Sequence, residues 1–152
     1  MPIYLKYGDI KGEVTEPAHR GWIELMSMQW GVGRAIQSPQ GATREGSAPS
    51  VSEIVVTKRQ DSASTRLFNE SMVGKGAKVV VEFVKDGTVY LRLVLSNTLI
   101  SGYSISGGAK SDRPMESLTL NFTKVEWVNM PGTPAETGTP DSVSYDLSQV
   151  TP

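Results

Sequence analysis

The stretch GWIELMSMQWGVGR, residues 21–34, has the composition of a β-strand but is apolar at both parities. A strand directs alternate side chains to opposite faces, so a strand covered on one face shows apolar and polar residues in turn. The apolar residues of one parity are Trp22, Met26, Met28 and Trp30, and those of the other parity are Ile23 and Leu25. Interpreted as one strand, this stretch needs a cover on each of its two sides.

Length and composition favour one β-rich domain. A chain of 152 residues hides roughly 70% of its unfolded surface and can hold a real core. Fifteen Gly and nine Pro, with Val, Ile, Thr and Tyr in the periodic segments, are typical of strands and turns. The net charge of −1 is scattered along the chain, so the basic stripe that nucleic acid requires is missing from the sequence.

The sequence lacks several features that would point to other classes of protein. Without cysteine there are no disulfides, cysteine-based zinc sites or thiol nucleophiles. No apolar run approaches the roughly 18 residues of a membrane span, so we expect no membrane insertion. Lys6 and Asp9 interrupt the apolar run that a secretory signal would need. We therefore expect a soluble chain that is made in the cytoplasm.

The remaining segments predict short strands and one helix. Strands are expected at 3–7, 51–58, 79–83, 89–95, 99–105 and 118–127. Asp86-Gly87 predicts a two-residue hairpin turn, and a change of apolar parity between Phe122 and Val125 predicts a bulge or a crossing between two sheets. A helix is expected from Ser64 to Val73.

That helix has a predicted cap, an apolar side and a stop. Ser62 or Ser64 is expected to cap it, and Gly74 is expected to end it. The side chains expected on one face are Leu67, Phe68, Ser71 and Met72. The fold class predicted for residues 1–152 is mainly β: a small β-barrel of two packed sheets with one short α-helix. It has an extended loop at 35–50 and a loose tail from about residue 130.

The sequence predicts no catalytic, cofactor or metal site. His19 is the one histidine and lies in a polar segment, so we expect a hydrogen-bonding surface group. No G-x-S-x-G elbow occurs, and the segment SGGAK at 106–110 lacks the context of a phosphate cradle. The carboxylates Asp9, Glu13, Glu16 and Glu24 cluster in sequence, which is typical of solvated charges. Met26 and Met28 beside the tryptophans form either a ligand slot or core packing.

The apolar surplus of residues 21–34 predicts self-assembly. Four or five apolar side chains left in water would forgo on the order of 6 to 15 kcal/mol, which rivals the stability of a typical domain. An identical subunit is one possible cover; the other is a core on one face and the helix on the second. Unpaired strand edges also need a partner, and a head-to-tail contact between copies closes into a ring when its rotation divides a full circle.

Five blocks of sequence, in this order and spacing, resemble the Hcp family, the haemolysin-coregulated tube proteins of bacterial type VI secretion. The blocks are YGDIKGE (7–13), His19, WIELMSMQWG (22–31), SAPSVSEIVVTKRQDSAS (47–64) and ESLTLNFTKVEW (116–127). The resemblance covers about residues 3–128. It implies a barrel with a helix at its side, ring-shaped homo-oligomers of six copies, and rings stacked into a hollow tube. A contractile sheath surrounds such a tube, a spike protein sits on its end, and the tube carries small effector proteins.

The resemblance also implies roles for individual residues. Ser27 and Gln29 would face the lumen, either as effector contacts or as merely solvated positions. The residues expected at a subunit interface or in the core are Trp22, Ile23, Leu25, Met28 and Trp30. The loop 35–50 would stack one ring on the next through Gln40, Arg44 and Glu45, and it differs from many relatives, whose loop is almost pure glycine. The helix would lie outside, where sheath subunits can reach it.

Two other functions fit the same residues. One is a phage tail tube protein, which is related in fold. The other is a monomeric β-barrel that binds a carbohydrate or peptide through Trp22, Trp30 and Trp127. A ring predicts a multiple of the 16.5 kDa monomer mass in solution, whereas a binding module predicts the monomer. The leading hypothesis places the protein in the cytoplasm when assembled and outside the cell after transport through the type VI apparatus, without a signal peptide.

Overall fold

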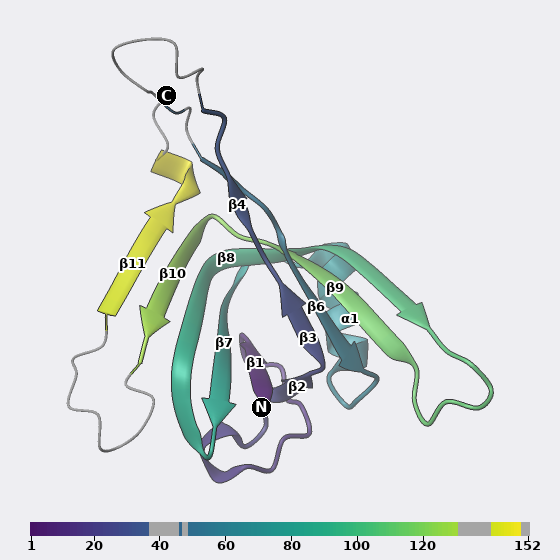
Figure 1. The fold of residues 1–152 in the computed structure, drawn as a ribbon. Helices are drawn as coiled ribbons and strands as arrows, with labels where there is room; N and C mark the ends of the chain where they lie inside the picture. Colours follow the sequence, from purple (N-terminus) through teal and green to yellow (C-terminus); the bar gives the residue numbers. More distant parts are fainter. Residues whose placement is uncertain (37–45, 47–48, 131–140, 150–152) are drawn as a thin grey trace.

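The computed structural model describes residues 1–36, 46, 49–130 and 141–149. Its elements are β1 (Ile3–Tyr7), the 3-10 helix η1 (Pro17–His19), β2 (Ile23–Leu25), β3 (Ser27–Gln29), β4 (Val32–Gly33), β5 (Ser50–Val51), β6 (Ile54–Arg59), α1 (Ser64–Val73), β7 (Ala77–Lys85), β8 (Thr88–Ser106), β9 (Met115–Asn121), β10 (Lys124–Asn129), β11 (Asp141–Asp146) and the 3-10 helix η2 (Leu147–Gln149). Figure 1 shows these strands wrapped into a barrel-like body with α1 at its side. The predicted mainly β class with one short helix is confirmed.

Nine of the described strands form two antiparallel sheets that share β8, and β4 pairs with β5 as a separate two-stranded sheet. The path of paired strands runs β2-β1-β7-β8-β9-β6-β3, with β10 paired to β8 and β11 paired to β10. Sheet A consists of β2, β1, β7, the first part of β8, β10 and β11; sheet B consists of β8 residues 99–106, β9, β6 and β3. Only Met26 separates β2 from β3 in the chain, so the two ends of the path meet and the body closes.

The strand β8 passes from sheet A to sheet B without ending. The sequence pattern predicts two strands there, at 89–95 and 99–105, whereas the structure has one strand that bends between them (Figure 1). Asn97 has a φ of +50° at the bend, a left-handed conformation that asparagine tolerates better than most residues. The parity change after Phe122 is the matching crossing on the next strands, since β9 belongs to sheet B and β10 to sheet A. The predicted crossing is therefore confirmed.

The stretch 21–34 is not one strand, so the prediction that it has two apolar faces is wrong. The strand is interrupted at Met26. The backbone N–H of Met26 donates to Thr57 O at 2.7 Å, and its side chain is 47% exposed. The break shifts the parity by one residue. The side chains that pack on the core are Ile23 and Leu25 before the break and Met28 and Trp30 after it. One core therefore covers most of the apolar residues, because both parities point to the same side.

The helix α1 has the predicted bounds but a different cap. Its N-cap is Ala63, and neither serine caps it. Instead, the Asp61 carboxylate accepts the N–H of Ala63 at 3.0 Å. Gly74 ends the helix as predicted, and its N–H donates to Glu70 O. Of the predicted apolar side only Leu67 is buried, and Phe68 and Met72 stay exposed.

The chain after residue 130 contains a strand, so the predicted loose tail is wrong for residues 141–149. The strand β11 pairs with β10 over six residues, and Leu147 N–H donates to Thr123 O at 2.7 Å. The loop 35–50 begins and ends in paired segments, β4 with β5 and the bridge of Ile36 to Gly46. Gln40, Arg44 and Glu45 lie outside the described residues. Within the described ranges, no helix has both the length and the hydropathy to cross a membrane.

Candidate functional site on the outer face of sheet B

The outer face of sheet B carries two rows of small or uncharged side chains. One row joins Ser27, Thr57, Ser117 and Ser104, which lie directly opposite one another on β3, β6, β9 and β8. The second row joins Gln29, Val55, Thr119 and Gly102 on the same four strands. None of these eight residues is buried. The structure thus brings Ser27 and Gln29, which are both exposed, into one continuous surface.

The two rows contain no charged side chain. The hydroxyls of Ser27 and Thr57 lie 2.5 Å apart and hydrogen-bond across the strands. Charges occur only at the margins, where Arg59 ends β6 and the Glu53 carboxylate accepts the Ser101 hydroxyl. The opposite face of the sheet packs on the core and on α1. Such a surface can solvate or hydrogen-bond a passing molecule without holding it by charge.

Both edges of sheet B are unpaired within the described part of the chain. β3 pairs only with β6, and residues 99–106 of β8 pair only with β9. An unpaired edge presents N–H and C=O groups that another strand can bind. Because the four strands alternate in direction, the two edges run antiparallel to each other. The edge of one copy can therefore pair with the opposite edge of another without breaking the alternation.

The other residues predicted for a site lie on the core side of the sheets or away from the outer face of sheet B. Ile23 and Leu25 are buried, whereas Met28 and Trp30 are partly buried against the core. Trp22 is partly buried against the His19 ring, with centroids 4.7 Å apart. Trp30 lies 6.2 Å from Trp127 between ring centroids. The three tryptophans of the carbohydrate hypothesis therefore do not line one site, since Trp22 does not line the pocket that holds the other two.

His19 is buried, so its prediction as a surface group is wrong. Its Nδ1 hydrogen-bonds the Glu16 carboxylate, and its Nε2 lies 2.6 Å from Glu82 Oε1. Glu82 in turn accepts from Arg92 Nε at 2.5 Å. The hydrogen bond from His19 lowers the pKa of Glu16. Both ring nitrogens are engaged, so this His19 cluster fastens the segment 10–22 to the outside of sheet A and offers no free base.

The segment 10–22 reaches His19 by a tight local fold. Gly12 N–H donates to Gly21 O at 2.7 Å, and Val14 N–H donates to Trp22 O at 3.1 Å. A Cβ on Gly12 would lie 2.3 Å from Trp22 O, so only glycine fits there. Gly21 has a φ of +82°. These glycines let a polar segment cross the sheet and bury its histidine. The polar composition of the segment gave no sign of this burial.

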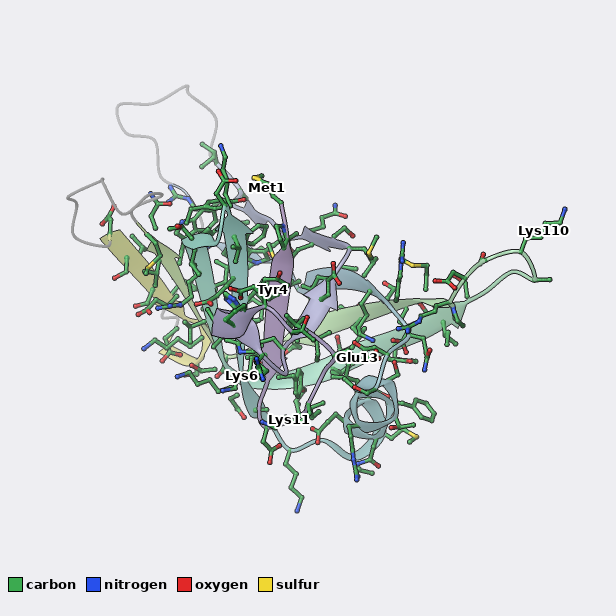
Figure 2. The ribbon with its side chains drawn as sticks, turned by 90° about the horizontal axis from the view of Figure 1, so that it is seen from below. Met1, Tyr4, Lys6, Lys11, Glu13 and Lys110 are labelled. Carbon is green, nitrogen blue, oxygen red and sulfur yellow. The ribbon has the colours of Figure 1, made fainter. Side chains whose placement is uncertain are left out.

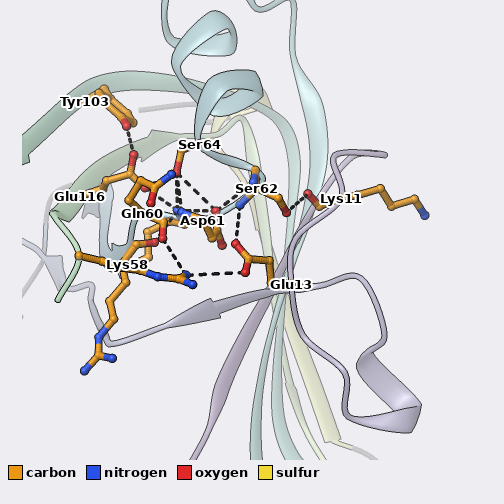
Figure 3. Close-up of polar contacts among 12 residues, drawn as sticks. Lys11, Glu13, Lys58, Gln60, Asp61, Ser62, Ser64, Tyr103 and Glu116 are labelled. Atoms are coloured by element: carbon orange, nitrogen blue, oxygen red, sulfur yellow. Dashed lines mark hydrogen bonds and ion pairs between the residues drawn. The ribbon is translucent and has the colours of Figure 1, made fainter.

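A second buried charge cluster ties α1 to the core side of sheet B (Figure 3). Lys58 Nζ donates to Asp61 at 2.9 Å and to Glu116 at 2.5 Å, and it lies 3.2 Å from the Ser64 hydroxyl. Tyr103 donates its hydroxyl to Glu116. A serine beside a lysine is a possible nucleophile and base, but this ammonium donates to two carboxylates and has no lone pair to offer. The Lys58 cluster therefore has a structural role, which is to hold α1 against the core side of sheet B.

The buried positions of Lys58 and Glu116 were not predicted, although the sequence carries a signal for them. Lys58 has the same parity as the buried Ile54 and Val56, and Glu116 has the same parity as Leu118. A charged residue at a core parity indicates either a strand end or a buried ion pair. The partners come from strands 58 residues apart in sequence, so the pattern of either strand alone does not choose between the two.

Other proteins are similar to this chain in sequence and in fold. The family model described as "Type VI secretion system effector, Hcp" matches residues 4–128. Protein hcp1 of Pseudomonas aeruginosa is 26% identical over 131 residues, which cover 83% of this chain and 81% of that protein. A solved structure described as a type six secretion system protein has a TM-score of 0.88 at 24% identity, over 97% of this chain and 96% of its own. Hcp1 from Salmonella typhimurium has a TM-score of 0.78 at 24% identity, over 97% and 95%. The chain therefore belongs to the Hcp family of type VI secretion system effectors.

Proposed function

We propose that this chain is the structural subunit of a type VI secretion inner tube, and that the outer face of sheet B lines its lumen. The observation that carries the proposal is the pair of antiparallel edges, unpaired among the described strands, on either side of an uncharged surface. Edge-to-edge pairing of β3 with residues 99–106 of the next copy is head-to-tail, and repetition gives a closed ring when the rotation between copies divides a full circle. Following the family resemblance, the ring is a homohexamer.

The surface chemistry supports a wall along which cargo passes. Ser27, Thr57, Ser117 and Thr119 offer hydroxyls, and Gln29 offers an amide. Weak hydrogen bonds spread over a wide surface hold small effector proteins without trapping them, because none of the eight residues in the two rows is charged. The proposed role is structural rather than enzymatic. It is supported by the engagement of Lys58 and His19 in buried clusters.

The remaining partners follow from the tube architecture. Rings stack through the loop 35–50, including Gln40, Arg44 and Glu45, and the contractile sheath and spike protein meet the outside and end of the tube. In Figure 1, α1 lies on the opposite side of sheet B from the proposed lumen wall, and its exposed polar residues Thr65, Arg66 and Asn69 are open to the sheath. The assembled tube forms in the cytoplasm and leaves the cell through the type VI apparatus.

Native mass spectrometry with negative-stain images tests the ring. We expect rings of about six times the 16.5 kDa chain mass. A monodisperse single chain at micromolar concentration would contradict the proposed function.

A cysteine pair tests the edge contact, because the chain has no cysteine of its own. A chain with Ser27→Cys and Ser104→Cys carries one thiol on each edge strand of sheet B. A short bis-maleimide should link it into a ladder of covalent oligomers that ends at the ring mass. The control chain carries Thr57→Cys and Ser117→Cys, whose positions are opposite each other within one copy and should give no ladder.

A further inference from the structure

An apolar groove of about 560 Å³ lies where sheet A extends beyond sheet B. The apolar groove is defined by Trp30, Val125, Trp127, Val143 and Tyr145, and Asn129, Asp141 and Ser144 also line it. Trp127 is opposite the buried Leu93 on one side and Val143 on the other, so these side chains have the parity that faces the core. Trp127 is nevertheless 42% exposed and Val143 72% exposed. The strand pair β10–β11 therefore carries apolar side chains of core parity that the described part of the chain leaves exposed.

A second apolar patch lies on the core side of the opposite edge of sheet B. This apolar knob is defined by Phe68, Met72, Tyr103 and Ile105. The rings of Phe68 and Tyr103 are 5.6 Å apart between centroids, while Met72 is 61% and Ile105 55% exposed. Tyr103 and Ile105 alternate with Ser104, so they point away from the proposed lumen wall.

The groove and the knob lie at opposite ends of the molecule. In Figure 1 the β8–β9 hairpin extends to the right and the β10–β11 pair lies at the left. Figure 2 shows the same hairpin from below, with Lys110 at its far tip. Two different apolar patches at opposite ends are suited to a head-to-tail contact, in which each copy uses one patch toward either neighbour.

We propose that the apolar knob of one copy fills the apolar groove of the next. This inference rests on the proposed ring. Trp30 directly follows the edge strand β3, and Tyr103 and Ile105 belong to the opposite edge, 99–106. Both patches lie on the side away from the lumen wall. Pairing of the two edges therefore places the knob against the groove on the outer side of the same junction, and the ring gains an apolar contact behind its wall.

Charge substitutions at two exposed positions test this contact. Val143→Glu in the groove and Ile105→Lys in the knob should leave the fold intact, because both side chains are largely exposed, and the thermal unfolding temperature checks this. Burial of one such side chain is worth about a factor of ten or more in an equilibrium constant. We expect each variant to raise the concentration at which rings dissociate at least about tenfold, measured by native mass spectrometry and sedimentation.

The double variant and a control test whether the knob and the groove contact each other. A chain with both Val143→Glu and Ile105→Lys should recover most of the lost ring stability, since the new charges are opposite and adjacent. Lys6→Glu, an exposed charge reversal on β1, should leave the dissociation concentration unchanged. The proposal is overturned if either single variant dissociates within about twofold of the unchanged chain, or if the double variant is no more stable than the weaker single variant. Absence of rings in the unchanged chain would contradict the proposed function itself.

Discussion

The two buried charge clusters fasten different parts of the chain and are closed to water to different degrees. The Lys58 cluster holds α1 to the core side of sheet B, and both Lys58 and Glu116 are buried. The His19 cluster holds the segment 10–22 to the outer side of sheet A, and its ends, Glu16 and Arg92, reach solvent. When His19 is replaced, water can therefore take over part of the lost hydrogen bonds. When Lys58 is replaced, water can take over few of them.

This difference shows how one fold supports two kinds of surface. On sheet B the charges lie behind the sheet, so the outer face is free to be small and uncharged. On sheet A the charges lie on the outer face and are covered by the segment 10–22. The face that we propose as the lumen wall is the one whose charges are buried behind it.

Removal of Lys58 should have the largest effect. Lys58→Met keeps the length of the side chain but leaves Glu116 buried beside Ser64 and Tyr103 with no cation. Breaking a buried pair in this way costs about 3 to 5 kcal/mol. Urea unfolding at pH 7 should show this loss in the free energy of unfolding. The double variant with Lys58→Met and Glu116→Leu should recover more than half of this loss. A loss below about 1 kcal/mol for Lys58→Met alone would contradict the expected difference between the Lys58 and His19 clusters.

The alkaline limit of stability should depend on Tyr7. Burial, with a smaller contribution from the Glu70 charge on α1, raises the pKa of Tyr7 to about 12, and its hydroxyl donates to Thr98 O at 3.1 Å. The folded chain thus binds this proton more tightly than the unfolded chain. The resulting stability is present below pH 10 and is lost as the pH rises from about 10 to 12.

A pH series of urea unfolding measures this contribution. The unchanged chain should lose roughly 2 to 3 kcal/mol more than Tyr7→Phe across that range. The comparison cancels the groups that titrate in both chains. Equal alkaline slopes for the two chains would show that Tyr7 ionises as freely in the folded state as in the unfolded state.

Replacement of His19 should cost less than replacement of Lys58. His19→Gln removes one of the two carboxylate contacts, but Glu82 keeps Arg92 as a partner. We expect a loss of about 1 to 2 kcal/mol in the free energy of unfolding. Limited proteolysis should cut the segment 10–22 faster, while the rings survive. A loss as large as that of Lys58→Met would mean that the two clusters are equally closed to water.

The smallest effect is expected at Glu16, the solvent-facing end of the His19 cluster. Its pKa is lowered by the hydrogen bond from His19. The stabilisation is therefore present above the ordinary pKa of a carboxyl group and is lost as the pH falls through the lowered pKa. Glu16→Gln should be slightly less stable than the unchanged chain at pH 7 and indistinguishable from it in acid. A difference that persists in acid would indicate packing rather than charge.

Sequence patterns were reliable where the signal was local. The hairpin at Asp86-Gly87 has positive φ at both residues, 51° and 76°, as the turn requires. The helix stops at Gly74, and the first strand spans Ile3–Tyr7. Local signals failed where one residue changes the parity, as at Met26, or where a polar segment folds over a sheet, as at His19. β11 was missed because its pairing depends on the edge that β10 offers.

The amino-acid sequence by itself determined the mainly β class, the one helix, the turn positions and the blocks that identify the family, because turn chemistry and apolar period act over a few residues. Only the tertiary structure decided that 21–34 covers one core rather than two and that Lys58 meets Glu116. It also decided that Ser27 and Gln29 join a wide uncharged wall. These features arise from strands that meet across long separations in the chain, where pairing and burial depend on the partner and not on the local pattern.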